Sequence, residues 1–122
     1  LMRSSAASDV YKRQLLTRMM MNLVSNAISY GKEYGHIWIR LIQKDTGIRL
    51  SIEDDGIGIA PEHINRIFDR FYRVDSSRSG AQGGSAGLGL AMVRWIVQAH
   101  DGTIQVESEP GKGSAFLVIF PT

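Results

Sequence analysis

Three short polar or glycine-rich clusters, each bounded by apolar segments, follow one another along this chain of 122 residues. They read Asn-Leu-Val-Ser-Asn at residues 22–26, Asp-Asp-Gly-Ile-Gly at residues 54–58, and Gly-Leu-Gly-Leu at residues 87–90. Each cluster alone is a weak signal. Together, in this order and between regular elements, they predict one pocket assembled from three separate parts of the chain.

The periodicity of the apolar residues indicates the elements that carry these clusters. Apolar side chains recur every three or four residues over residues 15–30 and 88–99, which predicts two helices. Alternation predicts strands at residues 37–41, 48–52, 103–107 and 115–120. Pro61 suits the first position of a short helix over residues 61–68. Residues 73–86 are rich in glycine and serine without a period, so we expect a mobile loop there.

This order of elements predicts an α+β fold, a two-layer α/β sandwich with a mixed, mostly antiparallel sheet and helices on one face. It does not match a parallel Rossmann sheet. The glycines at residues 87–89 lack the third glycine of the Rossmann fingerprint, and they also lack the lysine and hydroxyl residue of a P-loop. Neither of the two common phosphate-binding motifs is therefore present.

Composition excludes several functional classes. The absence of cysteine excludes disulfides, a thiol nucleophile and a cysteine-based metal site. A net charge of +2 is too small to indicate a nucleic-acid partner. No apolar run approaches the roughly 20 residues that a membrane span needs. We expect a cytoplasmic domain, although a larger parent protein can still be membrane-bound.

Residues 1–14 differ from the rest of the chain. Residues 1–7 are mostly small and polar, and residues 9–14, Asp-Val-Tyr-Lys-Arg-Gln, resemble the translated end of a transposon sequence used to prepare sequencing libraries. We interpret residues 1–14 as a non-native or disordered tail. The alternative is a linker from an upstream domain. The domain itself is predicted to occupy residues 15–122.

Two of the clusters carry oxygen atoms suited to a metal ion and a base. Asn22 and Asn26 lie one helical turn apart on the same side, and an asparagine oxygen suits Mg²⁺. The alternative is a pair of ordinary surface asparagines. Asp54 ends a strand, where its carboxylate can accept a hydrogen bond from an exocyclic amine such as that of adenine. Gly56 and Gly58 permit backbone angles and a close approach that a side chain would forbid. The alternative is a simple Asp-Gly turn.

The third cluster is suited to phosphate. Gly87 and Gly89 open a helix, whose free N–H groups and dipole attract anions, although a flexible linker is the alternative. Arg73 and Arg78 in the preceding loop can reach a γ-phosphate, or can be solvated. The three histidines, His36, His63 and His100, show neither metal-ligand spacing nor a carboxylate–serine arrangement, and we interpret them as structural or surface residues.

Taken with residues 67–73, Ile-Phe-Asp-Arg-Phe-Tyr-Arg, the clusters resemble the catalytic and ATP-binding domain of bacterial sensor histidine kinases. Residues 22–30, 54–58, 67–73 and 87–90 are similar to its N, G1, F and G2 boxes, in that order. The resemblance covers residues 15–122 and implies a Bergerat-type ATP-binding fold shared with gyrase, a heat-shock chaperone and a mismatch-repair ATPase. It also implies a truncated N-terminus, since members of this family usually have a further strand and the start of a helix before the position of residue 15.

The resemblance implies ATP and Mg²⁺ as ligands. It assigns Mg²⁺ to Asn26 with support from Asn22, and the adenine amine to Asp54. Around these it places Tyr30 near the purine, Gly56 and Gly58 at the base pocket, Arg73 in a lid over residues 73–86, and Gly87, Leu88 and Gly89 along the phosphates. Two positions depart from the pattern. Ser29 replaces the usual lysine or arginine, which removes one phosphate contact, and Ala86 is an apparent extra residue.

One residue separates a kinase from a hydrolase within this superfamily. The hydrolytic branches have a glutamate four residues before the metal-binding asparagine, whereas Asn22 in that place cannot take a proton. The implied activity is donation of the γ-phosphoryl group to a histidine on a dimerisation domain outside this chain. The implied partners are that domain and a response regulator, in a homodimeric parent at the bacterial inner membrane. The alternative is a nucleotide-binding regulatory module or degenerate kinase.

Overall fold

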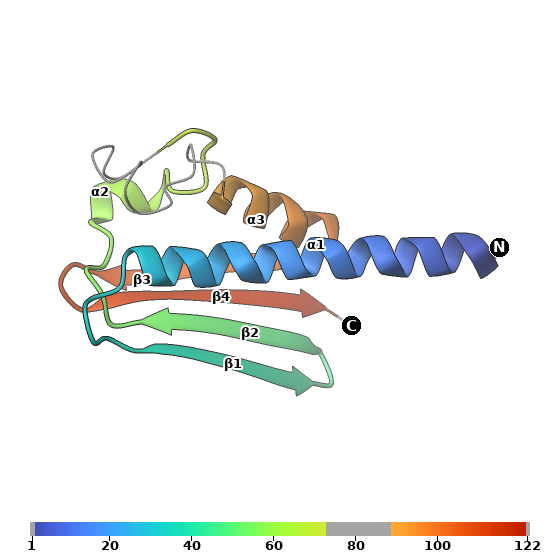
Figure 1. The fold of residues 1–122 in the computed structure, drawn as a ribbon, viewed down its shortest axis with the longest axis horizontal. Coiled ribbons are helices and arrows are strands. Elements are labelled where there is room, and N and C mark those ends of the chain that lie inside the picture. Colours follow the sequence, from blue (N-terminus) through green and yellow to red (C-terminus); the bar gives the residue numbers. More distant parts are fainter. Residues whose placement is uncertain (1, 73–88, 122) are drawn as a thin grey trace.

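The computed structural model describes residues 2–72 and 89–121, and side-chain surroundings from residue 9. Its elements are, in order, α1 (Met2–Ser29), β1 (Ile37–Lys44), β2 (Gly47–Asp54), α2 (Pro61–Ile64), α3 (Gly89–Ala99), β3 (Thr103–Glu109) and β4 (Gly113–Pro121). The strands form one sheet in the order β1-β2-β4-β3. Helices α1 and α3 pack against each other on one face of this sheet (Figure 1). The predicted two-layer α+β architecture is confirmed.

The sheet is antiparallel throughout its described strands rather than mixed. β1 pairs with β2, β2 with β4, and β4 with β3, each in antiparallel register. Short turns join β1 to β2 and β3 to β4, and a parallel pair would have needed a crossover connection of a dozen or more residues. The register places Asp54 of β2 opposite Ser114 of β4 and Ile37 of β1.

The first helix begins earlier than predicted. We expected a helix over residues 15–30, whereas α1 runs for 28 residues from Met2 to Ser29. Residues 2–29 contain neither glycine nor proline, and the segment before residue 15 includes the good helix formers alanine, arginine, lysine and glutamine. The first part of α1 projects beyond the sheet in Figure 1, and side chains 9–14 are exposed. A helical conformation does not establish the origin of residues 1–14, which remains a prediction.

Two other boundaries differ from expectation. The helix predicted over residues 61–68 is α-helical only over Pro61–Ile64 and continues as turns. Helix α3 begins at Gly89, within one residue of the predicted start. The predicted loop, residues 73–86, lies outside the described residues.

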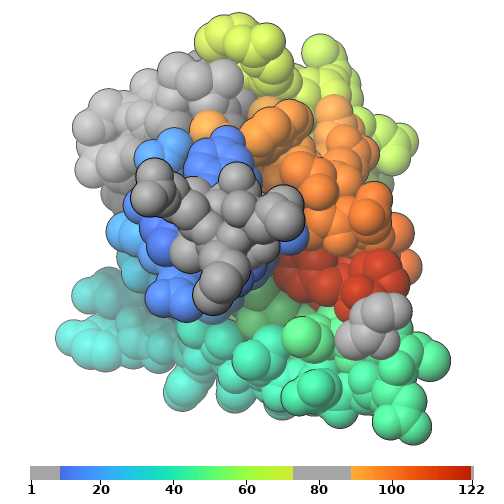
Figure 2. Space-filling model, turned by 90° about the vertical axis from the view of Figure 1, so that its right-hand side faces the viewer, coloured from blue at the N-terminus to red at the C-terminus, as the bar shows by residue number. Residues whose placement is uncertain are grey.

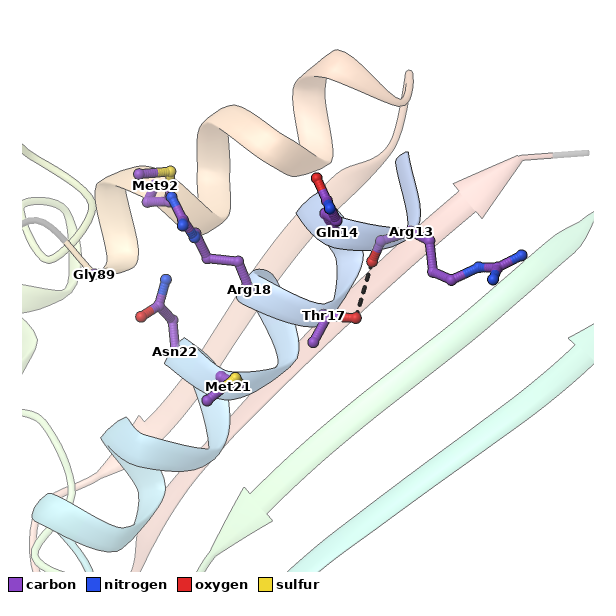
Figure 3. Close-up of a pocket in the computed structure, with 8 residues that line it drawn as sticks. All are labelled: Arg13, Gln14, Thr17, Arg18, Met21, Asn22, Gly89 and Met92. Carbon is purple, nitrogen blue, oxygen red and sulfur yellow. Dashed lines mark hydrogen bonds between the residues drawn. The ribbon is translucent and has the colours of Figure 1, made fainter. Parts of the chain in front are cut away.

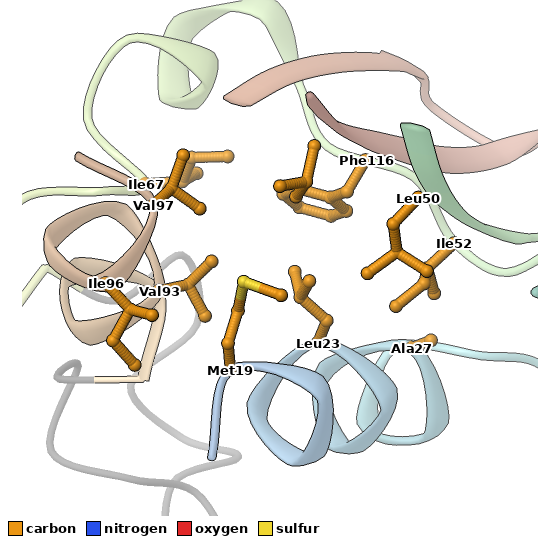
Figure 4. Close-up of a cluster of buried hydrophobic side chains, with 11 residues drawn as sticks. Met19, Leu23, Ala27, Leu50, Ile52, Ile67, Val93, Ile96, Val97 and Phe116 are labelled. Atoms are coloured by element: carbon orange, nitrogen blue, oxygen red, sulfur yellow. The ribbon is translucent and has the colours of Figure 1, made fainter. Parts of the chain in front are cut away.

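The core lies between the helical layer and the sheet. Met19, Leu23 and Ala27 are four residues apart on α1 and share its buried face. Alternate residues of β2 and β4 point to the same layer, as Figure 4 shows. The remaining buried apolar residues are Leu50, Ile52, Ile67, Val93, Ile96, Val97, Phe116 and Val118. Phe68 packs edge-on against Phe116 with ring centroids 6.3 Å apart, so the segment after α2 rests on the core.

Strand β1 lies at the edge of the sheet and is exposed along its whole length. Ile39 and Leu41 stand opposite the buried residues Ile52 and Leu50, yet they are 50% and 70% exposed. Figure 2 shows β1 below and to one side of α1, while α3 covers the other side above β4. The helices therefore leave the core-facing side of β1 open to solvent.

Candidate functional site

The loop that follows β2 begins with a buried carboxylate. Asp54 is only 8% exposed, and its Oδ1 accepts a hydrogen bond of 2.9 Å from the N–H of Gly56. Burial raises the pKa of Asp54 above its ordinary value of 3.8, while the backbone N–H groups of Gly56 and Ser114 act in the opposite direction. A carboxylate has about four acceptor positions, so acceptor capacity remains after these two bonds. Asp54 can therefore receive a further donor such as an exocyclic amine.

The same loop lies directly on the end of α1. A Cβ atom at Gly56 would stand 2.1 Å from the carbonyl oxygen of Tyr30, a distance that no real side chain tolerates. Ile57 donates its N–H to that oxygen at 3.1 Å. The absence of a side chain at Gly56 thus allows the Asp54 loop to pack against the helix that carries Asn22 and Asn26.

The turn between β3 and β4 supports the loop from its other side. Gly58 adopts a φ of 75°, and a Cβ atom there would stand 2.2 Å from the carbonyl oxygen of Glu109. Gly111 donates its N–H to the oxygen of Ile57 at 2.8 Å. Ser108 Oγ accepts the N–H of Ile59 at 2.7 Å and donates to the oxygen of Gly113 at 2.9 Å. The sequence did not single out Ser108 as a site residue, because one half-buried serine at the end of a strand produces no pattern.

Asp55 also fixes the loop, through His36, which thus has the structural role that we predicted for it. The N–H of His36 donates to Asp55 Oδ1 at 2.7 Å, and His36 Nδ1 lies 3.0 Å from Oδ2. Lys32 Nζ lies 3.8 Å from the same carboxylate. The hydrogen bonds from His36, followed by the charge of Lys32, lower the pKa of Asp55. Asp55 therefore ties the segment between α1 and β1 to the loop.

One side of α1 connects this loop to the start of α3. Asn22, Asn26 and Tyr30 follow one another at four-residue intervals and are all half-buried. Eight residues of helix span about 12 Å along the axis, a distance that a nucleoside triphosphate can bridge. The N–H of Tyr30 donates to the oxygen of Asn26 at 3.1 Å, so the helical geometry continues to Tyr30.

An open cavity of about 700 Å³ lies at the Asn22 end of this row of residues, beside the start of α3. Figure 3 shows its lining, which is Arg13, Gln14, Thr17, Arg18, Met21, Asn22, Gly89 and Met92. Gly89 is the first residue of α3, so the cavity lies at a helix N-terminus, where backbone N–H groups favour anions. Asn22 and Gly89 are the two predicted site residues that line it.

The predicted site residues thus form two groups along α1. Asp54 and Gly56 lie with Tyr30 at one end, Asn22 lies with Gly89 at the other, and Asn26 lies between them on the helix. Gly58 lies against the β3–β4 turn. The other predicted residues, Arg73, Arg78, Gly87 and Leu88, lie outside the described part of the chain. Among the described residues, no three His, Cys, Asp or Glu side chains converge to hold a metal ion.

The remaining two histidines have local neighbours. His63 Nδ1 contacts the hydroxyl of Tyr72, and the Arg66 guanidinium lies 4.6 Å from the centre of the Tyr72 ring. His100 Nδ1 lies 2.8 Å from the oxygen of Ile96, one turn earlier in α3. These contacts link α2 and α3 to the segments that follow them.

Comparison with known proteins places the chain in a defined group. Residues 11–122 match the family described as "Histidine kinase-, DNA gyrase B-, and HSP90-like ATPase". The chain is 48% identical over 107 residues to the sensor-like histidine kinase SenX3 of Mycobacterium tuberculosis, covering 88% of this chain and 26% of that protein. It is 46% identical over 99 residues to the phosphate regulon sensor protein PhoR of Pseudomonas aeruginosa, covering 81% and 22%. The chain spans about a quarter of these relatives.

Solved structures show the same fold. The mycobacterial sensor histidine kinase MprB superposes with a TM-score of 0.74 at 32% identity, covering 88% of this chain and 70% of that one. The catalytic domain of the histidine kinase ThkA gives 0.74 at 31% identity, covering 89% and 67%. Full-length ShkA in complex with AMPPNP gives 0.72 at 28% identity, covering 88% and 22%.

Proposed function

Because the chain belongs to the family of histidine kinase-, DNA gyrase B- and HSP90-like ATPases, as an ATP-binding catalytic domain of the sensor histidine kinase type, we propose the following activity. The domain binds Mg-ATP along α1, between the loop after β2 and the start of α3. It then donates the γ-phosphoryl group to a histidine that lies outside these 122 residues. The observation that carries this proposal is the buried Asp54 carboxylate, held against the end of the helix that presents Asn22 and Asn26.

The base end of the site favours adenine. Asp54 is an acceptor, and the exocyclic amine of adenine is a donor, so the two pair directly. Guanine has a carbonyl at the corresponding position, which would bring two acceptors together and give the buried carboxylate no further donor. Gly56 and Gly58 hold the loop close to Tyr30 and Glu109, which fixes the carboxylate in place.

The asparagine side of α1 fits a magnesium ion bound together with phosphate. Mg²⁺ takes few protein ligands and completes its shell with phosphate oxygens and water. The Asn26 side-chain oxygen would hold it, with Asn22 beside it one turn away. When bound, the ion neutralises charge on the β- and γ-phosphate oxygens.

In the transfer step, a histidine nitrogen attacks the γ-phosphorus while the bond to the β–γ bridging oxygen breaks and ADP leaves. The contribution of this chain is positioning and charge stabilisation. Asn22 occupies the place where a hydrolase of this superfamily would carry its general base, and an amide cannot accept the proton of an attacking water. We therefore propose transfer to histidine and not deliberate hydrolysis.

The partners proposed for the parent protein follow from its relatives, which are sensor kinases. They are the dimerisation domain that carries the acceptor histidine and a response regulator, in a homodimer at the bacterial inner membrane. Among the described residues, no helix has the length and apolar character of a membrane span. The second candidate is a nucleotide-binding module without phosphotransfer, which Ser29 in place of a basic residue favours.

The two candidates differ in a direct experiment. Isothermal titration calorimetry of the chain with ATP and GTP, with and without Mg²⁺, tests the pocket. We expect saturable, adenine-selective binding that strengthens with Mg²⁺. Adding the dimerisation domain of the same parent with γ-labelled ATP then tests transfer, with Asp54→Asn as the control. Acid-labile, alkali-stable label on that domain supports the kinase. ATP binding without label supports the regulatory module, and no ATP binding by folded protein contradicts both.

A further inference from the structure

We propose that Arg18 is an additional phosphate-binding residue, which contacts the terminal phosphate of ATP from α1. This inference rests on the proposed function, namely that the nucleotide lies along α1 with its base at Asp54. It adds to that proposal one cationic side chain, Arg18, and a preference for ATP over nucleotides with fewer phosphates.

The position of Arg18 supports this role. Arg18 precedes Asn22 by one helical turn, so the two side chains share one side of α1. Both line the cavity of about 700 Å³, together with Gly89 and Met92 of α3. Figure 3 shows the Arg18 side chain extended from α1 toward Met92, beside Asn22 and near Gly89. The guanidinium thus lies in the gap between α1 and the start of α3.

The orientation of the nucleotide along α1 identifies the terminal phosphate as the group that reaches Arg18. The Asp54 loop contacts Tyr30, at the opposite end of the line that runs back through Asn26 and Asn22 to Arg18. A nucleotide whose base lies at Asp54 extends its phosphates toward the earlier residues of the helix. Arg18 is the last of these positions, and it meets the group farthest from the base.

The Arg18 side chain is exposed, and among the described residues it has no ion-pair or hydrogen-bond partner. By contrast, Lys32 lies 3.8 Å from Asp55 and Arg66 lies 3.5 Å from Asp69. Arg13 is the second cation that lines the cavity, but Figure 3 shows its guanidinium directed away from Gly89.

The chemistry of the guanidinium suits this position. Its planar fork donates two parallel N–H bonds to phosphate oxygens. The N-terminal N–H groups of α3 add positive potential on the other side of the cavity. The γ-phosphate carries the greatest charge of the three phosphates of ATP and is absent from AMP. The contribution of Arg18 should therefore appear with ATP and vanish with AMP.

Calorimetry of the whole chain with MgATP and AMP tests the proposal. Arg18→Gln keeps much of the side-chain length and helix propensity while it removes the charge. We expect the Kd for MgATP to rise roughly tenfold, as for the loss of one charge-assisted hydrogen bond, and the Kd for AMP to stay within about twofold. Arg13→Gln removes the same charge from the same helix and should change neither value. Arg18→Lys should restore part of the affinity.

The outcomes separate this proposal from the proposed function. If Arg18→Gln leaves the MgATP affinity unchanged while the wild type binds, the Arg18 proposal is wrong and the ATP site stands. An equal loss of MgATP affinity in Arg13→Gln would mean that any positive charge on this part of α1 has the same effect. That result would also overturn the Arg18 proposal. If the wild type binds AMP and MgATP with equal affinity, the proposed placement of the phosphates beside Asn22 and Arg18 is wrong as a whole. Matching thermal unfolding midpoints exclude misfolding of the variants.

Discussion

Gly56 lies so close to Tyr30 that a Cβ atom on the glycine would stand 2.1 Å from the carbonyl oxygen of Tyr30. The N–H of Ile57 bonds to the same oxygen at 3.1 Å. This contact joins the end of α1 to the loop that carries Asp54. It therefore sets the distance between the proposed base-binding carboxylate and the asparagines of the helix.

Replacing Gly56 with alanine should disturb this junction. The added methyl group has to displace backbone atoms, which costs about 1–3 kcal/mol in well-packed regions. We expect a lower thermal unfolding midpoint and weaker ATP binding, measured by circular dichroism and calorimetry. Gly111→Asn is the control, because Gly111 has no atom within 4 Å of its would-be Cβ and asparagine tolerates its φ of 82°. An unchanged midpoint and affinity in Gly56→Ala would show that the loop moves freely.

Asp54→Asn should separate binding from stability. Loss of the charge weakens the hydrogen bond to the adenine amine, so we expect ATP affinity to fall about tenfold. Because burial raises the pKa of Asp54, the ionised group costs stability at neutral pH, and that cost disappears as pH falls through the raised pKa. The variant should therefore be no less stable than wild type at pH 7, with its relative stability falling in acid.

A matched control for Asp54 is Glu53→Gln. Glu53 precedes Asp54 in β2, is half-buried and lies 3.8 Å from Arg40 on the neighbouring strand. This variant should keep wild-type ATP affinity. An equal loss of affinity in both variants would contradict a specific adenine contact at Asp54.

Asn26→Asp should impair the use of magnesium. A carboxylate at this position repels the phosphates and changes the charge of the site, whereas the amide offers an oxygen without charge. We expect the gain in ATP affinity on adding Mg²⁺ to fall by several-fold, and phosphotransfer to fall with it. Ser25→Asp places the same charge on the adjacent, exposed position and serves as control. The same magnesium dependence in wild type and Asn26→Asp would remove Asn26 from the metal site.

Asp55→Asn should reveal a pH-dependent support of the loop. His36 lowers the pKa of Asp55 below the ordinary value of 3.8, so ionised Asp55 stabilises the fold above that value. This contribution is lost as pH falls through the lower folded-state pKa. Wild type should unfold at a higher temperature than the variant at neutral pH, and the two midpoints should converge in strong acid.

Circular dichroism melts over a pH series measure this convergence. Glu62→Gln, which removes an exposed carboxylate from α2, should follow the wild-type curve throughout. A constant offset between Asp55→Asn and wild type at every pH would mean that the bond to His36 does not depend on the charge of Asp55.

Local patterns in the sequence determined much of this protein. Three- and four-residue spacing predicted α3 and the buried face of α1, and alternation predicted the four strands, because both repeats follow from backbone geometry within one element. The Asp-Asp-Gly-Ile-Gly cluster predicted a tight loop with close backbone approach, and Gly56 and Gly58 show that approach. These features depend on neighbours in sequence, so a single chain is enough to predict them.

The tertiary structure alone decided which distant residues meet. His36 bonds to Asp55 across 19 positions, and Ile59 bonds to Ser108 across 49. The uniform antiparallel register and the turn of α1 that places Arg18 beside Gly89 likewise depend on how the layers pack. No local repeat encodes such contacts, because their energies arise only when the helices bury their apolar faces on the sheet. The sequence by itself determined the elements and the clusters of polar residues, and packing of the two layers decided how these clusters form one site.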